Sequence, residues 1–274
     1  MPLHIANVGS SFAAGPGIPP QIEPRGAGRS GENYAHIVAR KLEARLTDLS
    51  VSGATLLNLL SEPQTVRRGE TFAPQINEIP EDVDVVLVLG GGNDIGYIGG
   101  LFIDSFYSYA VFRAISRIYS WFAGGPESTA VLSVEDLAER YGTVLDAIHA
   151  KAPNAKVVVV EYLSLLGSDL QPGVDVPFDA SLLDGHKAKA AQVREATVKA
   201  VHNRDAWCTR LPVAEASIGH GLGSPEPWVN GWGLSNLYLG CGYHPNAEGM
   251  KAVADIVLRN LVELGIAGDS AKGV

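Results

Sequence analysis

The sequence predicts an α/β fold in which helices cover both faces of a parallel sheet. Segments with strand character alternate with segments of helical spacing along the 274 residues. Two strand segments, 84–89 and 156–162, are almost continuously apolar, as is typical of parallel strands buried on both faces. No linker, repeat or low-complexity tract interrupts the alternation, so we expect a single domain over residues 1–274.

The expected elements follow one another along the chain. The first strand covers residues 3–8 and ends at Gly9, and apolar residues then recur at helical spacing over residues 33–46. The later segments are a short strand at 49–52, strands at 84–89, 156–162 and 207–212, and helices at 134–151, 186–203 and 245–264. The Gly- and Pro-containing segments 16–31 and 167–185 are expected to be loops.

Composition and charge exclude some classes of protein. Hydrophobic residues make up 46% of the chain and charged residues 19%, which is an ordinary globular balance. The net charge is −9 and no basic face is visible, so we expect no nucleic-acid partner. The chain begins Met-Pro-Leu-His, without a basic start or a long apolar core. This favours a cytoplasmic protein, with a trimmed secreted form as the alternative.

The cysteines and the absence of ligand motifs bear on cofactors. Cys208 and Cys241 could form one disulfide or be two reduced, buried thiols, and their spacing is not that of a metal site. The sequence contains no Gly-x-x-x-x-Gly-Lys phosphate loop and no Gly-x-Ser-x-Gly nucleophile motif. We therefore expect neither a metal nor an organic cofactor.

Aromatic side chains gather in residues 101–122, where eight occur within 22 positions. A transmembrane span is not expected, because Asp104, Arg113 and Arg117 interrupt the stretch. Helical spacing allows an ordinary core helix. The alternative is a lid or an apolar pocket wall over residues 96–125, which follow directly on a Gly-Gly-Asn-Asp segment.

Four polar or small residues occupy positions where ligands bind in such folds. Ser11, Gly53 and Asn93 each follow a predicted strand, and His244 precedes the last helix. The carboxyl ends of parallel strands meet at one edge of the sheet. We therefore expect the first three residues to be neighbours, and the loop before the last helix can bring His244 to the same edge.

These residue types match the requirements of acyl transfer. A serine hydroxyl becomes a nucleophile when a base such as histidine removes its proton. Backbone N–H groups and an asparagine amide can stabilise the resulting oxyanion. Each residue also has a structural interpretation, since Gly53 suits a turn, Asn93 suits a turn or helix cap, and His244 suits a helix start.

Four segments in a fixed order carry a resemblance to a known family. They are residues 9–15 (Gly-Ser-Ser-Phe-Ala-Ala-Gly), 52–55 (Ser-Gly-Ala-Thr), 91–94 (Gly-Gly-Asn-Asp) and 244–249 (His-Pro-Asn-Ala-Glu-Gly). Together they resemble the four blocks of the SGNH, or GDSL-type, hydrolases and span nearly the whole chain. The resemblance implies a flavodoxin-like three-layer α/β/α sandwich with a five-stranded parallel sheet in the order 2-1-3-4-5.

The resemblance also implies an activity and a role for each site residue. It implies hydrolysis of a small-molecule carboxylic ester without a cofactor, with Ser11 as nucleophile and His244 as base. It places the oxyanion between the Ser11 N–H, the Gly53 N–H and the Asn93 side chain. The aromatic stretch suggests an apolar acyl or aryl group on the ester.

The chain departs from the family pattern at two positions. Ser10 stands where the family has aspartate, and Gly15 sets the register that favours Ser11 over Ser10 as the nucleophile. Cys241 stands three positions before His244, where the family has its catalytic acid. We expect a backbone carbonyl to orient His244 instead, with a distant Asp or Glu as the alternative.

Two other functions use the same segments. One is a non-catalytic flavodoxin-like module that binds phosphate or a nucleotide through backbone N–H groups of residues 9–17. Arg25 and Arg29 are the only basic residues near that loop, which disfavours this function. The other is an acyltransferase, which would pass the acyl group from the same serine to an alcohol rather than to water.

Overall fold

A five-stranded parallel sheet forms the centre of the computed structural model, which describes residues 2–67, 69–109 and 132–268. Its strands are β1 (His4–Gly9), β2 (Arg45–Asp48), β5 (Val85–Leu89), β6 (Lys156–Val160) and β7 (Cys208–Leu211). They lie in the order β2-β1-β5-β6-β7, and every neighbouring pair is parallel. Numbered among themselves, these strands have the predicted order 2-1-3-4-5, which confirms the α/β class.

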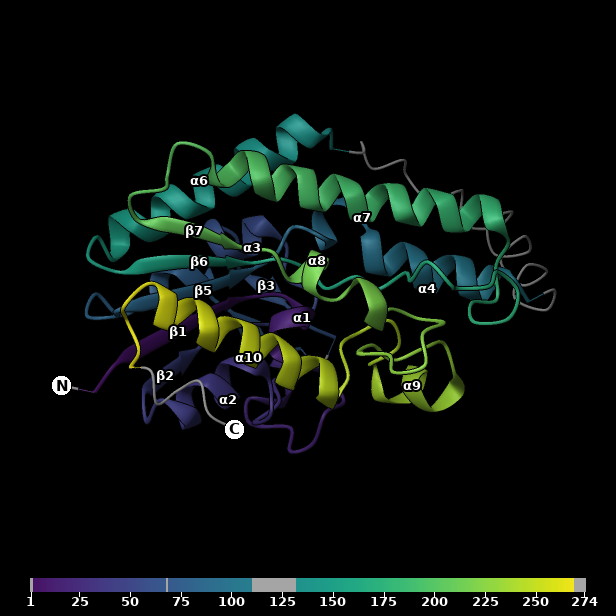
Figure 1. Cartoon of the computed structure of the whole chain (residues 1–274), viewed down its shortest axis with the longest axis horizontal. Helices are drawn as coiled ribbons and strands as arrows, with labels where there is room; N and C mark the ends of the chain where they lie inside the picture. Colours follow the sequence, from purple (N-terminus) through teal and green to yellow (C-terminus); the bar gives the residue numbers. More distant parts are fainter. Residues whose placement is uncertain (1, 68, 110–131, 269–274) are drawn as a thin grey trace.

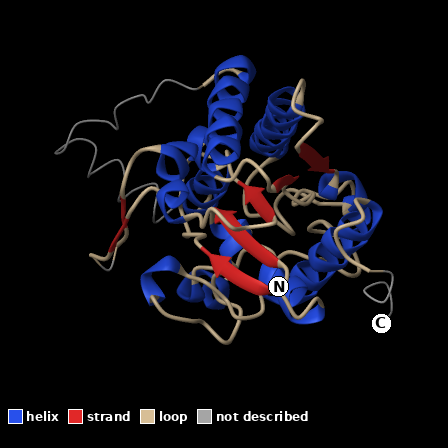
Figure 2. Cartoon of the chain, turned by 90° about the vertical axis from the view of Figure 1, so that its left-hand side faces the viewer, coloured by secondary structure: helices blue, strands red, loops and turns tan. Residues whose placement is uncertain are grey.

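Helices cover both faces of the sheet (Figures 1 and 2). In Figure 1, two long helices lie above the sheet, α6 (Val134–Lys151) and α7 (Ala180–Val201). Two helices lie below it, α2 (Tyr34–Lys41) and α10 (Ala247–Glu263). Every residue of β1 and β5 is buried, as the apolar runs in the sequence predict for central strands covered on both sides.

The boundaries differ from the predictions at two helices. α2 ends at Lys41 because Glu43 adopts a left-handed backbone conformation (φ 50°), so β2 begins at Arg45 rather than at residue 49. α7 begins at Ala180, inside the segment expected to be a loop. Its N-cap is Asp179, whose side chain accepts the Leu182 N–H.

Short elements surround the sheet. They are the helices α1 (Ser11–Ala14), α3 (Leu56–Leu60), α4 (Tyr97–Tyr107), α8 (Val213–Ala216) and α9 (Leu234–Leu239), the 3₁₀ turns η1 (Arg25–Ala27), η2 (Gln75–Glu78), η3 (Asn93–Ile95) and η4 (Ile218–His220), and the strands β3 (Gln64–Thr65) and β4 (Thr71–Phe72). β3 and β4 form a separate antiparallel pair that the sequence did not predict, because two residues are too few for an alternating pattern. No helix in the described ranges is long and apolar enough to cross a membrane.

The expected lid or wall segment is described only in part. Residues 96–109 contain α4, which lies at the same end of the molecule as α9 in Figure 1. Residues 110–125 of the predicted segment lie outside the described residues.

Candidate active site

The two adjacent serines after β1 have different environments. The Ser10 side chain is fully buried, and its hydroxyl lies 3.1 Å from the Tyr162 hydroxyl, within hydrogen-bond distance. Ser11 is the first residue of α1, and its hydroxyl makes no hydrogen bond to any residue that the structure describes. Gly15 ends this single turn in a left-handed conformation (φ 79°) and donates its N–H to the Ser11 carbonyl. Ser10 is therefore engaged in the protein, whereas the Ser11 hydroxyl is available to a ligand.

Distant side chains hold the backbone just before the serines. Gly9 has φ 151°, and a Cβ atom at that position would lie 2.2 Å from the Leu89 carbonyl oxygen, so only glycine fits. The Gly9 N–H donates to Gln75 Oε1 at 2.8 Å, and Gln75 Nε2 donates to the Gly9 carbonyl at 3.0 Å. Tyr162 accepts the Gly92 N–H at 3.1 Å in addition to its contact with Ser10. Neither Gln75 nor Tyr162 was predicted from the sequence to support the site.

Gly53 and Asn93 come together at the same edge of the sheet. The Val51 N–H donates to the Gly9 carbonyl at 3.0 Å, which joins the Gly53 loop to the end of β1. Asn93 Nδ2 donates to the Ala54 carbonyl at 2.8 Å, which joins the Asn93 turn to that loop. An amide NH₂ group has two N–H bonds, so one N–H of Asn93 is left for another acceptor. Gly53 is exposed and has φ 85°, a conformation that favours glycine.

Asp94 fixes the position of the Asn93 turn. Its side chain is fully buried, with one oxygen accepting the Leu56 N–H at 2.9 Å and the other 2.9 Å from Arg140 Nη1. Burial raises the pKa of the Asp94 carboxyl, while the Leu56 N–H and Arg140 act in the opposite direction. Asp94 therefore ties the turn to the start of α3 and to α6.

His244 is buried and held by a backbone carbonyl. The distance from His244 Nδ1 to the Gly242 carbonyl oxygen is 2.7 Å. Because a carbonyl only accepts, Nδ1 carries the proton and Nε2 of the neutral ring has a lone pair. Burial lowers the pKa of His244 to about 4, so the ring is neutral at pH 7. The ring of Phe12, the residue after Ser11, lies 5.5 Å from the imidazole centroid to centroid.

Main-chain hydrogen bonds fix the loop that carries His244. The Asn230 N–H donates to the His244 carbonyl at 2.8 Å, and the Tyr243 N–H donates to the Asn230 carbonyl at 2.9 Å. Immediately after the loop, the Asn246 side chain caps α10 by accepting the Gly249 N–H at 2.8 Å. The conformation of this loop therefore depends mainly on backbone groups.

The Cys241 thiol makes no hydrogen bond to the imidazole. Its Sγ lies 3.8 Å from Asn236 Oδ1, and burial raises the pKa of the thiol, so it is protonated at neutral pH. Neither Cys241 nor Cys208 forms a disulfide, which settles the alternative left open by the sequence. Within the described ranges, no Asp or Glu pairs with His244 and no cluster of three metal-ligating side chains occurs. The group that orients His244 is the Gly242 carbonyl, as expected from a backbone rather than a carboxylate partner.

An aromatic wall, formed by Phe102, Phe106, Trp232 and Tyr243, lies on one side of His244. The ring of Phe102 lies 6.3 Å from His244, 5.5 Å from Tyr243 and 6.0 Å from Trp232. The ring of Phe106 is perpendicular to Trp232 at 5.0 Å. Phe102 and Phe106 of the aromatic stretch thus lie beside the site, whereas its last four members, Phe112, Tyr119, Trp121 and Phe122, lie outside the described residues.

Comparisons with known proteins identify the family of the chain. The model of the GDSL-like lipase/acylhydrolase family matches residues 8–252. Lipase 2 of Streptomyces coelicolor is 25% identical over 279 aligned positions, which cover 92% of this chain and 84% of that protein.

Two solved structures share the fold. The extracellular lipase of Streptomyces rimosus has a TM-score of 0.69 at 21% identity, covering 93% of this chain and 98% of that one. Phospholipase A1 of Streptomyces albidoflavus NA297 has a TM-score of 0.72 at 19% identity, covering 94% and 98%. Because the family model matches most of the sequence, the chain belongs to the GDSL-like lipase/acylhydrolase family and is a carboxylic ester hydrolase.

Proposed function

We propose that this enzyme hydrolyses esters through an acyl-enzyme on Ser11, with His244 as the general base. The observation that carries the proposal is the hydrogen bond from His244 Nδ1 to the Gly242 carbonyl. It leaves Nε2 as the basic atom of a neutral imidazole. In the first step, Nε2 takes the Ser11 hydroxyl proton while Oγ attacks the ester carbonyl carbon. The same proton then passes to the departing alkoxide, and a water molecule repeats the sequence to release the acid.

Three N–H groups are assigned to the developing oxyanion. The Ser11 N–H lies at the start of α1, where a helix provides no internal acceptor. The Gly53 N–H belongs to an exposed turn, and the second N–H of the Asn93 amide is left over from its bond to Ala54. Donors fixed in advance in this way stabilise the transition state without having to reorganise.

For the substrate, we propose an ester with an apolar acyl or aryl group that packs along the aromatic wall. A pocket of about 520 Å³ adjoins this wall and is lined by Phe106, Trp232 and Leu237 together with residues 173–175 and Pro177. Apolar lining of this kind suits a hydrocarbon or aryl group rather than a sugar.

The nucleophile is tested with two matched serine variants. Ser11→Ala is expected to lower kcat on p-nitrophenyl butyrate by about 10³-fold or more, because it removes the nucleophile. Ser10→Ala removes only the contact with Tyr162 and is expected to keep most of the activity. Circular dichroism confirms that both variants fold. Full activity in Ser11→Ala together with loss of activity in Ser10→Ala would show that Ser10, and not Ser11, is the nucleophile.

The acyl preference is tested with a chain-length series of p-nitrophenyl esters. Phe106→Ala should lower kcat/KM for octanoate more than for acetate, because only the longer chain reaches the wall. Ile103→Ala is the matched control, since it removes a 54% exposed side chain from the same helix. A uniform loss of stability with an unchanged chain-length profile would show that Phe106 is only a core residue.

A further inference from the structure

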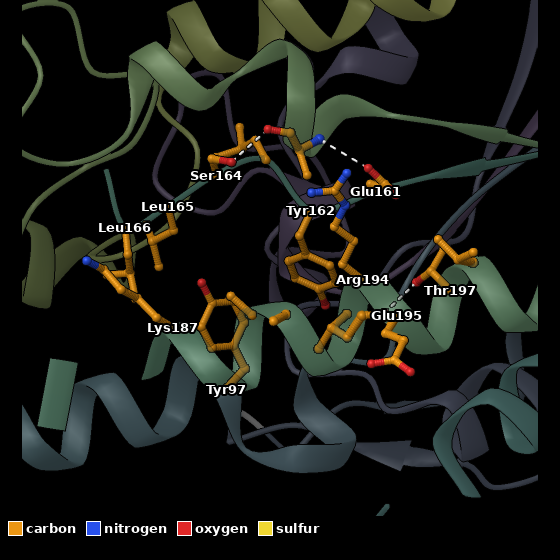
Figure 3. A pocket seen from close by; sticks show the side chains of 16 residues that line it. Tyr97, Glu161, Tyr162, Ser164, Leu165, Leu166, Lys187, Arg194, Glu195 and Thr197 are labelled. Atoms are coloured by element: carbon orange, nitrogen blue, oxygen red, sulfur yellow. Dashed lines mark hydrogen bonds between the residues drawn. The ribbon is translucent and has the colours of Figure 1, made fainter. Parts of the chain in front are cut away.

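A second pocket lies away from the candidate catalytic residues. It has a volume of about 450 Å³ and lies between α7 and the loop that follows β6, as Figure 3 shows. Neither Ser11, Gly53, Asn93 nor His244 lines it. Its size is in the range of small-molecule sites.

Tyr162 separates this pocket from the serine turn. Its ring lines the pocket, whereas its hydroxyl contacts Ser10 Oγ at 3.1 Å and accepts the Gly92 N–H at 3.1 Å. Phe12 packs on the Tyr162 ring at 4.6 Å. The pocket and the serine turn therefore lie on different sides of one fully engaged tyrosine.

Most of the pocket surface is apolar. The loop after β6 contributes Leu163, Leu165 and Leu166, and α7 contributes Ala190 and Val193. A surface of this kind gains free energy by removing a hydrocarbon chain from water.

Two polar groups on the pocket lack a partner in the described ranges. The Tyr97 side chain lines the pocket and is 1% exposed, and its hydroxyl makes no hydrogen bond to a described residue. Burial raises the pKa of this phenol, so its hydroxyl stays protonated and can donate. In Figure 3 the Tyr97 hydroxyl and the Lys187 ammonium lie toward the same side of the pocket.

Lys187 is also the charged residue of the described lining that lacks an ion-pair partner among the described residues. The other charged residues of the lining are each paired: Arg194 with Glu215, Glu195 with Lys199, and Glu161 with Arg210. Lys187 has no ion pair within the described part of the chain. The pocket therefore suits a ligand whose polar head group is an anion.

We propose that this pocket binds a medium-chain carboxylate as a second ligand, separate from the ester substrate. The carboxylate lies at Lys187 Nζ and the Tyr97 hydroxyl, and the hydrocarbon chain lies along the leucines after β6 and the apolar face of α7. The inference goes beyond the proposed function, because binding at this site does not require Ser11 to react.

Direct binding to the Ser11→Ala protein tests the chemical class of the ligand. The probes are decanoate, 1-decanol and decyltrimethylammonium, titrated calorimetrically below their micelle-forming concentrations. Decanoate is expected to bind more tightly than 1-decanol and decyltrimethylammonium. In a further titration, octanoate is expected to bind about fourfold more weakly than decanoate for each of the methylenes it lacks. Equal affinity for all three head groups would overturn the proposal, as would a complete lack of decanoate binding.

Variants locate the site. Lys187→Met keeps the apolar stem and removes the charge, so it should weaken decanoate binding about tenfold and leave decanol binding unchanged. Lys251→Met is the matched control, because it removes a lysine on the opposite face of the sheet and should change nothing. Equal decanoate affinity in the two variants would place the ligand elsewhere.

Ala190→Phe fills the pocket and tests whether the pocket is independent of the catalytic site. In the otherwise unmodified enzyme it should abolish decanoate binding while p-nitrophenyl acetate turnover stays within about twofold. Loss of both together in a folded protein would show that the pocket is part of the catalytic site and would contradict a separate ligand.

Discussion

The two loops that carry Ser11 and His244 are held by different kinds of interaction. The backbone before Ser11 is fixed by side chains from distant elements, Gln75 at 66 residues' separation and Tyr162 at 152 from Ser10. The His244 loop is fixed by main-chain groups, including the Gly242 carbonyl and the backbone of Asn230. The serine loop should therefore be sensitive to remote substitutions, whereas the histidine loop should tolerate many side chains.

After loss of the nucleophile itself, the largest effect is expected at Asn93, whose side chain is assigned to the oxyanion. Asn93→Ala should lower kcat by roughly 10²- to 10³-fold with little change in KM, because an oxyanion donor acts in the transition state. Steady-state kinetics on a p-nitrophenyl ester measures both constants. A raised KM with unchanged kcat would show that Asn93 binds the ground-state substrate instead.

The burial of His244 should be visible in the pH dependence of kcat/KM. Because burial lowers the pKa of His244 to about 4, the acid limb of kcat/KM should be centred near that value rather than near 6.5. A carbonyl partner has no full charge to stabilise imidazolium, which agrees with the direction of this shift. An acid limb near pH 6.5 would contradict a buried His244 as the general base.

The same shift predicts a loss of stability in acid. Below pH 6.5 the unfolded chain binds a proton at His244, while the folded protein does not until about pH 4. The free energy of unfolding should therefore fall as the pH drops from about 6.5 to about 4, by about 3 kcal/mol from this residue. Urea unfolding of wild type and His244→Asn across this pH range isolates the contribution of His244. The same pH dependence of the free energy of unfolding in both proteins would contradict the prediction.

A smaller effect is expected at Gln75, which tests the remote support of the serine turn. Gln75→Leu leaves the buried Gly9 N–H without its acceptor and should lower the free energy of unfolding by about 1–3 kcal/mol, with a fall in kcat. Gln192→Leu is the control, because this glutamine also bonds a backbone carbonyl but lies half-buried on α7. Equal effects in the two variants would show that the serine turn does not depend on Gln75.

The same contrast explains which features could be predicted from sequence. Ser11, Gly53 and Asn93 follow strands, and His244 precedes a helix, so local patterns place all four at one edge of the sheet. Gln75 carries no such signal, because its role exists only after a turn 66 residues away has folded beside it. Tyr162 is the last residue of a predicted strand, yet its hydroxyl contacts depend on the packing of β6 beside β5.

Boundary errors have local physical causes. Asp179 is a good N-cap three residues before Leu182, but Gly185 within the helix resembles a loop residue in the sequence. Glu43 adopts a positive φ that its residue type does not predict. Both features moved the ends of elements without changing the order of the sheet.

The smallest effect is expected at Cys241, the position where the family has its acid. The thiol lies 3.8 Å from Asn236 Oδ1 rather than against the imidazole, and His244 Nδ1 is already bonded to Gly242. Cys241→Ala should therefore keep kcat within about tenfold of wild type, a barrier change of no more than about 1.4 kcal/mol. Steady-state kinetics measures the change, with circular dichroism to confirm folding. A 10³-fold loss of kcat in folded Cys241→Ala would show that His244 depends on the side chain of Cys241 and not on the backbone carbonyl.

Cys241→Asp sharpens this last comparison, because it restores the residue type that the family has at this position. A carboxylate that reached Nδ1 would compete with the Gly242 carbonyl and stabilise imidazolium more strongly, which would raise the pKa of His244. The acid limb of kcat/KM would then move upward from about 4 together with kcat. A carboxylate that instead occupied the place of the thiol near Asn236 would leave the acid limb where it is. We expect the second outcome, because the backbone of the loop directs the side chain at 241 toward Asn236 and is itself fixed by main-chain bonds.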